Sequence, residues 1–188
     1  GAVSPMSPTP RQAGLLLHPT SLPGGHGVGD LGGEATRLLD WMAGADLTLW
    51  QVLPTCPVGL DGSPYSAWSA LGGNPLLVDL HALVAAHLLD VSDLHGAPHA
   101  ERVDYPAALA FKLPRVRKAA SRLCNNDQHP WRADLSAFER DNAWAAESAL
   151  FAAERAHQDG APWWAWPTAI RDRQPRALAA ARRRHADA

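Results

Sequence analysis

Short apolar runs separated by Gly- and Pro-rich stretches mark the first part of the chain. The runs GLLLH (14–18) and LTLWQVLP (47–54) are continuous rather than alternating, which favours strands that are buried on both faces. Between them, EATRLLDWMAGAD (34–46) has apolar residues at helical spacing, with Asp30 as its predicted cap and Gly44 near its end. This order predicts a βαβ unit with two adjacent parallel strands.

From residue 74 onward the pattern becomes mainly helical. The segment NPLLVDLHALVAAHLLD predicts a short strand or turn and then a helix. Further helices are predicted at 105–124, 134–140, 142–158 (ended by Gly160) and from Pro175 onward. None of these segments has the pattern of a buried strand, so two parallel strands alone would leave open edges. We therefore expect the chain to be the beginning of a larger fold.

Composition and charge exclude several classes of partner. The 188 residues are 46% hydrophobic and 19% charged, which is ordinary for a globular domain. A formal net charge of -2 gives no electrostatic basis for binding nucleic acid or a membrane surface. No apolar run approaches a transmembrane length, and the N-terminus does not read as a signal peptide. We expect a cytoplasmic protein with neither a nucleic-acid nor a membrane partner.

Spacing argues against a metal or nucleotide cofactor. Cys56 and Cys124 lie far apart without metal-ligand spacing, and we interpret them as small buried hydrophobic residues. The segment GVGDLG (27–32) matches a dinucleotide fingerprint formally, but eight residues separate it from His18 at the end of the first strand. The candidate acid, Asp46, precedes the second strand instead of ending it. We expect glycines that serve turns and close packing, and no cofactor.

The most informative segment is the long irregular loop GLDGSPYSAWSALGGNPLL (59–77). Ser63 precedes a proline and is therefore held extended, and Pro64 fixes its own backbone angle. Tyr65 is then presented on a stiff platform beside several hydroxyl groups, an arrangement that suits the apolar face and polar rim of a sugar. The alternative is that Tyr65 and Trp68 only anchor the loop to the domain.

Position along the chain places this loop next to a second one. The residues HPTS (18–21) leave the carboxyl end of the first strand, and the 59–77 loop leaves the carboxyl end of the second. Ligands bind at this edge in parallel α/β sheets and barrels.

His18 has no second metal ligand at suitable spacing, so a hydrogen-bonded structural role competes with a role as base or ligand. No paired carboxylates of the kind that glycoside chemistry needs are predicted at this edge.

Two groups near the C-terminal end are interpreted structurally. The cluster Trp163, Trp164 and Trp166 is predicted to pack between helices rather than to form a binding platform. The run Arg182-Arg183-Arg184 is predicted to be a solvated helix face. Neither group is assigned a function.

Five segments, taken in order and spacing, resemble the 4-α-glucanotransferase family, also called amylomaltase or disproportionating enzyme. They are LLLHPTSLPGGHGVGDLG (15–32), LWQVLP (49–54), GSPYSAWSALGGNPLL (62–77), RVDY (102–105) and ALFAAERAHQDGAPWWAWP (149–167). The resemblance implies an α/β fold, in which the first βαβ part of a (β/α)8 TIM barrel is followed by a mainly helical inserted subdomain. It also implies transfer of α-1,4-glucan segments between maltooligosaccharides, with retention, through a covalent glycosyl-enzyme.

The resemblance assigns roles to individual residues. Ser63 and Tyr65 match the family's SPY element, which contacts glucose units in the donor sites. A second set of residues would shape the barrel mouth and contribute less directly to substrate binding: His18, Thr20, Ser21 and Gln51. Two departures weaken some polar contacts, because Gly62 and Ser66 stand where the family often has Asp and Gln.

The implied domain layout follows from the same resemblance. Residues 1–12 would be a flexible tail, 13–84 the start of the barrel, 85–170 a helical insertion, and 171–188 a helix leading back to the barrel. A barrel needs about 250 residues before insertions, so the chain is expected to lack the family's nucleophilic Asp, acid/base Glu and stabilising Asp. The isolated chain is expected to be inactive, with the remainder of its own barrel or a complementing chain as partner.

Two alternatives remain open from the sequence. The first is a non-catalytic glucan-binding or regulatory remnant that kept the sugar loop and lost the chemistry. The second is a helical interaction protein with an accidental α/β start. Both lack glucan transfer, and only the first predicts binding of maltooligosaccharides through Tyr65.

Overall fold

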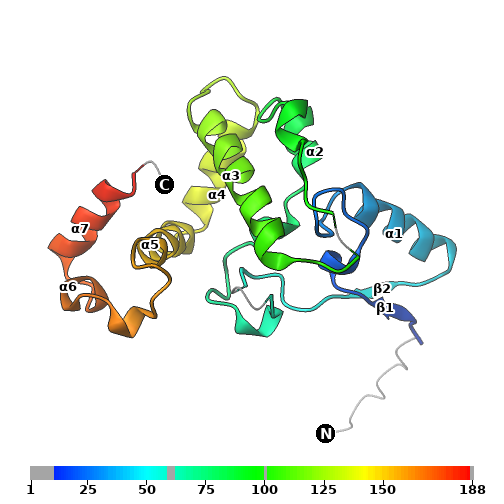
Figure 1. Cartoon of the computed structure of the whole chain (residues 1–188), viewed down its shortest axis with the longest axis horizontal. Coiled ribbons are helices and arrows are strands. Elements are labelled where there is room, and N and C mark those ends of the chain that lie inside the picture. The colour runs from blue at the N-terminus through cyan, green and yellow to red at the C-terminus, as the bar shows by residue number, and fades with distance from the viewer. Residues whose placement is uncertain (1–10, 59–61, 100, 187–188) are drawn as a thin grey trace, which may run out of the picture.

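A computed structural model describes residues 11–58, 62–99 and 101–186 of the chain (Figure 1). The predicted tail at 1–12 lies almost wholly outside the described residues. The strands and α1 lie at one end of the molecule, α6 and α7 lie at the other, and α3 crosses the middle. The strands and helices are β1 (Gly14–Leu16), α1 (Gly33–Gly44), β2 (Leu49–Gln51), α2 (Leu80–Ala85), α3 (Tyr105–Cys124), α4 (Trp131–Asp141), α5 (Trp144–His157), α6 (Thr168–Arg171) and α7 (Pro175–Arg184).

The two strands form the predicted parallel pair around α1. Leu15 lies opposite Trp50 in the register, and the strands are the only ones in the described parts of the chain. Gly14 permits a close approach, because a Cβ there would lie 2.5 Å from the carbonyl oxygen of Leu49. The indole Nε1 of Trp50 donates a hydrogen bond of 2.7 Å to the carbonyl of Leu17. The prediction of a β–α–β unit is confirmed.

The prediction that both strands are buried on both faces is wrong. Leu16 is 57% exposed, Leu49 is 48% exposed and Val52, just after β2, is 40% exposed. Each strand has only three residues, and within the described residues no third strand pairs with either. An apolar run reflects what the side chains prefer, whereas burial requires neighbours to cover them.

The start of α1 also differs from the prediction. The N-cap position is Gly32 rather than Asp30. One carboxylate oxygen of Asp30 accepts a hydrogen bond from the amide of Gly32 at 3.1 Å, and the other accepts one from Lys112 Nζ at 2.8 Å. Asp30 therefore supports the turn into α1 while pairing with α3. The predicted end of the helix at Gly44 is confirmed.

The glycines between β1 and α1 serve turns and close packing, as predicted. Gly27 has φ +81° and lies against Pro98. A Cβ on Gly29 would lie 2.2 Å from the carbonyl oxygen of Pro19, so no larger residue fits without a shift.

The helices α2 and α3 enclose the larger apolar core of the described residues. Its buried members are Leu80, Leu88, Leu89, Phe111 and Ala119. Helix α3 begins after Asp104, whose carboxylate accepts a hydrogen bond from the amide of Ala107 at 2.9 Å. The helices predicted at 105–124, 134–140 and 142–158 are confirmed as α3, α4 and α5, and the short strand or turn after residue 74 is a turn.

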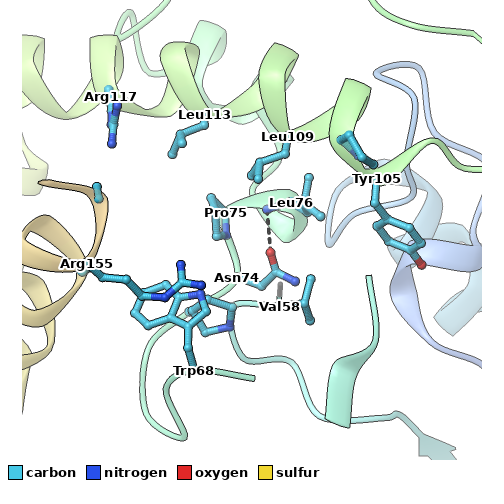
Figure 2. Close-up of a pocket in the computed structure, with 15 residues that line it drawn as sticks. Val58, Trp68, Asn74, Pro75, Leu76, Tyr105, Leu109, Leu113, Arg117 and Arg155 are labelled. Carbon is cyan, nitrogen blue, oxygen red and sulfur yellow. Dashed lines mark hydrogen bonds between the residues drawn. The ribbon is translucent and has the colours of Figure 1, made fainter. Parts of the chain in front are cut away.

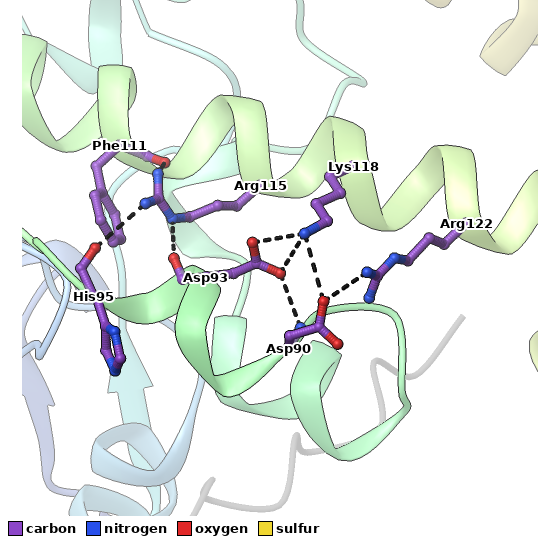
Figure 3. Close-up of polar contacts among 7 residues, drawn as sticks. All are labelled: Asp90, Asp93, His95, Phe111, Arg115, Lys118 and Arg122. Atoms are coloured by element: carbon purple, nitrogen blue, oxygen red, sulfur yellow. Dashed lines mark hydrogen bonds and ion pairs between the residues drawn. The ribbon is translucent and has the colours of Figure 1, made fainter.

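A polar network covers the outer surface where α3 passes the segment after α2 (Figure 3). Lys118 Nζ lies 2.7 Å from both carboxylate oxygens of Asp93. Arg122 Nη2 lies 2.6 Å from Asp90 Oδ2, and the amide of Asp90 donates to Asp93 Oδ2 at 2.9 Å. These partners hold the pKa of both carboxyl groups below the usual value, first through the hydrogen bonds from Arg122 and Lys118.

Helix α5 ends and α7 begins as the sequence predicts. Gly160 has φ +76°, and its amide donates to the carbonyl of Arg155 at 2.8 Å, which closes the helix end. Pro175 occupies the first turn of α7.

The arginine run on α7 is not simply a solvated face. Arg184 Nη1 lies 2.9 Å from Glu154 Oε1, and Glu154 is 1% exposed. Arg182 Nη2 lies 2.6 Å from Glu147 Oε1. Two of the three arginines therefore join α7 to α5, and the third, Arg183, has no ion pair with any described residue.

Two further interpretations need correction. Trp166 is buried and its ring centroid lies 5.2 Å from that of Phe151, but Trp163 and Trp164 are 51% and 65% exposed. Cys124 is exposed and Cys56 is half-buried, so neither cysteine is a buried hydrophobic residue.

No described helix has the length and apolarity needed to cross a membrane.

Candidate functional site

The two loops predicted to meet do leave the same edge of the strand pair. The amide of Leu17 donates to the carbonyl of Gln51 at 3.1 Å, just where both strands end. The chain then turns through His18–Ser21 on one side and enters the 52–77 loop on the other. Gln51, the last residue of β2, is itself exposed.

The first loop is a tight turn. The amide of Ser21 donates to the carbonyl of His18 at 2.9 Å, closing a single 3₁₀ turn over Pro19–Ser21. Ser21 is exposed, whereas Thr20 is buried and its Oγ1 lies 3.2 Å from the hydroxyl of Tyr105. Thr20 therefore positions the turn, and Ser21 is the hydroxyl that faces outward.

His18 is half-buried at the start of this turn. Its Nδ1 is buried and, within the described residues, has no hydrogen-bond partner. Burial lowers the pKa of His18 from its ordinary value, because the charged ring is costly to desolvate. The ring is thus neutral at neutral pH, and the hydrogen-bonded structural role is not observed at Nδ1.

The second loop presents its tyrosine as predicted. Ser63 is extended, with φ -70° and ψ 123°, and Pro64–Ser66 form a 3₁₀ turn closed by the amide of Ser66 on the carbonyl of Ser63 at 3.1 Å. Tyr65 is 75% exposed on this turn. A rigid, solvent-facing aromatic ring is therefore present beside hydroxyl groups.

Trp68 behaves differently from Tyr65. It is half-buried, its ring stacks on Phe151 with a centroid distance of 6.1 Å, and the guanidinium of Arg155 lies 5.6 Å from its ring centroid. The anchoring alternative therefore holds for Trp68 and does not hold for Tyr65.

The base of the second loop is closed by hydrogen bonds. The amide of Asn74 donates to the carbonyl of Thr55 at 3.3 Å, and the Asn74 side chain accepts from the amide of Leu76 at 3.0 Å. Cys56 Sγ donates to the carbonyl of Ala70 at 3.3 Å. These contacts tie both ends of the loop together.

Tyr105 joins the two loops, and sequence reasoning gave it no role. Its hydroxyl pairs with Thr20 in the first loop, and its ring lies against Gly62, where a Cβ would come within 2.4 Å of it. Gly62 has φ +67° and directly precedes Ser63. The RVDY segment that ends at Tyr105 offered a signal, but nothing in it indicated contacts 85 residues away.

Lys112 is a second missed residue. It is fully buried, and its Nζ donates to Asp30 Oδ2 at 2.8 Å and to the carbonyl of Leu76 at 2.7 Å. Burial lowers the pKa of Lys112, although the hydrogen bond to Asp30 acts in the opposite direction. The lysine thereby ties the segment after the first loop, the end of the second loop and α3 together.

The acidic side chains near this edge already have partners. Asp30 and Asp79 both approach Gly32, but Asp30 is paired with Lys112, and Asp79 accepts from the amide of His81 at 2.8 Å. The described residues hold no group of three or more His, Cys, Asp or Glu side chains that would bind a metal ion. An exposed aromatic ring, exposed hydroxyls and a neutral histidine suit an uncharged polyhydroxyl ligand.

Comparison with known proteins agrees with this geometry. The family model described as 4-alpha-glucanotransferase matches residues 17–188. The chain is 42% identical over 175 residues to the chloroplastic/amyloplastic 4-alpha-glucanotransferase of Oryza sativa subsp. japonica, covering 89% of this chain and 29% of that protein. It is 42% identical over 170 residues to the 4-alpha-glucanotransferase of Thermus thermophilus, covering 90% and 34%.

A solved structure matches as well. The amylomaltase from Streptococcus agalactiae in complex with acarbose superposes with a TM-score of 0.87 at 30% identity, covering 93% of this chain and 36% of that one. The chain thus spans about a third of the length of these relatives. A match that begins at residue 17 and runs to residue 188 means that the chain belongs to the 4-alpha-glucanotransferase family.

Proposed function

We propose that the edge formed by the two loops binds α-1,4-glucan, and that it serves a 4-α-glucanotransferase that moves glucan segments between maltooligosaccharides with retention. The observation that carries this proposal is Tyr65, held 75% exposed on a closed turn at the carboxyl edge of a parallel strand pair. Ligands collect at that edge in parallel α/β folds.

The binding roles follow from exposure. Tyr65 would offer an aromatic face for the C–H side of a glucose ring, and the exposed Ser21 of the first loop would offer a hydroxyl. Ser63, two residues before Tyr65, is half-buried and would contact the sugar from the start of the turn. His18 and Gln51 lie at the strand ends and would contact the sugar rim. Thr20, being buried against Tyr105, would hold the turn in place rather than contact the sugar.

We propose the matching layout for the fold. Residues 13–84 would form the first βαβ part of a (β/α)8 barrel, and the exposed Leu16 and Leu49 would pack against further barrel elements. Residues 85–170 would be the helical insertion that borders the glucan groove, and 171–188 would lead back to the barrel. The nucleophile and the acid/base would come from later barrel strands, so the chain alone would bind glucan without cleaving it.

A chimera tests the proposal. Residues 1–188 would be joined to the part of the Thermus thermophilus relative that follows its matched segment, and glucose release from maltotriose would be measured. We expect activity from the chimera and none from the 188 residues alone. Tyr65→Ala in the chimera should lower kcat/KM about tenfold through a higher KM, because one stacking face is lost.

The control is Trp41→Ala, which removes a comparably exposed aromatic ring from α1 and should leave KM unchanged. A folded chimera with no turnover would favour the non-catalytic remnant. Equal effects of Tyr65→Ala and Trp41→Ala would remove the sugar-binding role of Tyr65. Turnover by the isolated chain would overturn the assignment of the catalytic groups to later strands.

A further inference from the structure

A cavity lies between the second loop, α3 and α5 (Figure 2). Its volume is about 420 Å³, which is within the range of small-molecule sites. Its walls are mainly apolar: the described residues Pro57, Val58, Pro75, Leu76, Pro106, Leu109, Leu113, Ala152 and Ala156 contribute to them.

Two cations line the same cavity. Arg117 reaches down from α3, and Arg155 reaches from α5 across the face of Trp68 (Figure 2). Neither guanidinium has an ion-pair partner among the described residues, whereas most other arginines of the helical part do. The described lining contains no Asp or Glu.

Apart from the two arginines, two polar side-chain atoms of the lining already have partners. The side-chain oxygen of Asn74 is already used by the amide of Leu76. The hydroxyl of Tyr105 is paired with Thr20 outside the cavity. Guanidinium groups, in contrast, match a carboxylate in shape and charge and can bind it through two parallel hydrogen bonds.

We propose that this cavity binds an organic carboxylate with a flat or extended apolar body. The apolar walls would bury the body, and Arg117 and Arg155 would bind the carboxylate. Because Arg155 already lies over Trp68, part of its side chain is ordered before the ligand arrives, which lowers the entropy cost of binding. This inference is independent of the proposed function, since Tyr65 does not line the cavity.

The probe pair is 2-naphthoate and its neutral isostere 2-naphthamide, titrated into the 188-residue chain by calorimetry. We expect saturable binding of the naphthoate, and affinity at least about tenfold lower for the amide, because the charge-assisted hydrogen bonds are lost. Backbone amide shifts should change along α3 and α5.

Three variants locate the site. Arg155→Gln and Arg117→Gln should each weaken naphthoate binding about tenfold while changing naphthamide binding much less. Arg117 is exposed and makes no described ion pair, so its variant keeps the test valid if Arg155→Gln disturbs the loop. The matched control is Arg183→Gln on α7, which lies outside the cavity and should bind like the parent chain.

The contrary outcomes are distinct. Equal affinity for naphthoate and naphthamide would reduce the cavity to an apolar pocket with no anion site. An equal loss in Arg183→Gln would indicate nonspecific charge attraction. Absence of saturable naphthoate binding would also overturn the proposal. Tyr65→Ala should leave naphthoate binding unchanged, so failure here and failure of the glucan proposal are separable.

Discussion

Helix α3 carries two sets of ion pairs with the same chemistry and different surroundings. On its inner side, fully buried Lys112 pairs with Asp30, which is almost buried. On its outer side, Lys118 and Arg122 pair with Asp93 and Asp90 while remaining exposed to solvent (Figure 3). Water competes for the outer pairs much more than for the inner one, so the fold depends on the two sets very differently.

The buried and the exposed ion pairs also differ in what they hold in place near the candidate site. The inner pair fixes Asp30 beside the start of α1, and Lys112 also holds the carbonyl of Leu76 at the end of the second loop. The outer pairs only join the segment around Asp90 to the surface of α3. Ion pairs of the same kind therefore organise the candidate site in one place and a helix surface in the other.

The largest loss of stability is expected for Lys112→Met, which keeps the length of the side chain and removes its charge. It leaves Asp30 without its cation and the carbonyl of Leu76 without its donor. Breaking one half of a buried pair costs about 3–5 kcal/mol of unfolding free energy, which urea titration followed by circular dichroism would measure.

Its matched control is Lys118→Met on the outer side of the same helix. That variant should unfold close to the parent midpoint. If the two variants lost equal stability, burial would not be what distinguishes the two sets of pairs.

A pH titration of stability should show a smaller effect in the same buried region. His26 is buried against His81 and Phe111, and its pKa is lowered, mainly by desolvation and then by His81 and Lys112, against the opposite influence of Asp30 and Asp79. The unfolded chain therefore binds a proton before the folded chain does. Stability is complete above the ordinary histidine pKa of about 6.5 and falls as the pH drops below it toward the lower folded value.

The variant His26→Gln should flatten this decline below about pH 6.5, leaving the contribution of His18, whose pKa is also lowered by burial. His99→Gln, at an exposed position, should leave the curve unchanged. Thermal unfolding across this pH range provides the measurement. Parallel curves for the parent and His26→Gln would show that His26 does not couple protonation to folding.

The smallest expected effect belongs to the outer network. Arg122→Gln should change the urea midpoint by no more than the error of the titration, because both partners are solvated. Any effect in low salt should disappear as ionic strength rises and screens the pair. A loss of stability that persists in high salt would contradict the comparison.

Local rules predicted the parts of this fold that depend on neighbouring residues. The βαβ order, the extended Ser63 before Pro64 and the end of α5 at Gly160 follow from apolar runs, proline geometry and glycine geometry. The two loops were expected to leave the same edge because parallel strands have their carboxyl ends on the same side of a sheet. This is a rule of topology and not of neighbouring residues.

The parts that depend on distant residues were not predictable in this way. Lys112 lies in a helix where a lysine ordinarily faces water, and only the packing of α3 on Asp30 and Leu76 makes it buried. Tyr105 touches Thr20 and Gly62 across long stretches of chain. The exposure of Leu16 and Leu49 depends on what covers the strands, which no apolar run specifies.

The separation of 82 positions between Asp30 and Lys112 has a consequence for how the protein is made. At a synthesis rate of about 5–20 residues per second, Asp30 waits roughly 4–16 s for its partner to be translated. During that interval the candidate site lacks Lys112, and the strand pair presents Leu16 and Leu49 with open edges. The ribosome-bound chain is therefore a natural client for chaperones that recognise exposed apolar strands, and this demand should persist after α3 is complete, because Leu16 and Leu49 are still exposed in the folded chain.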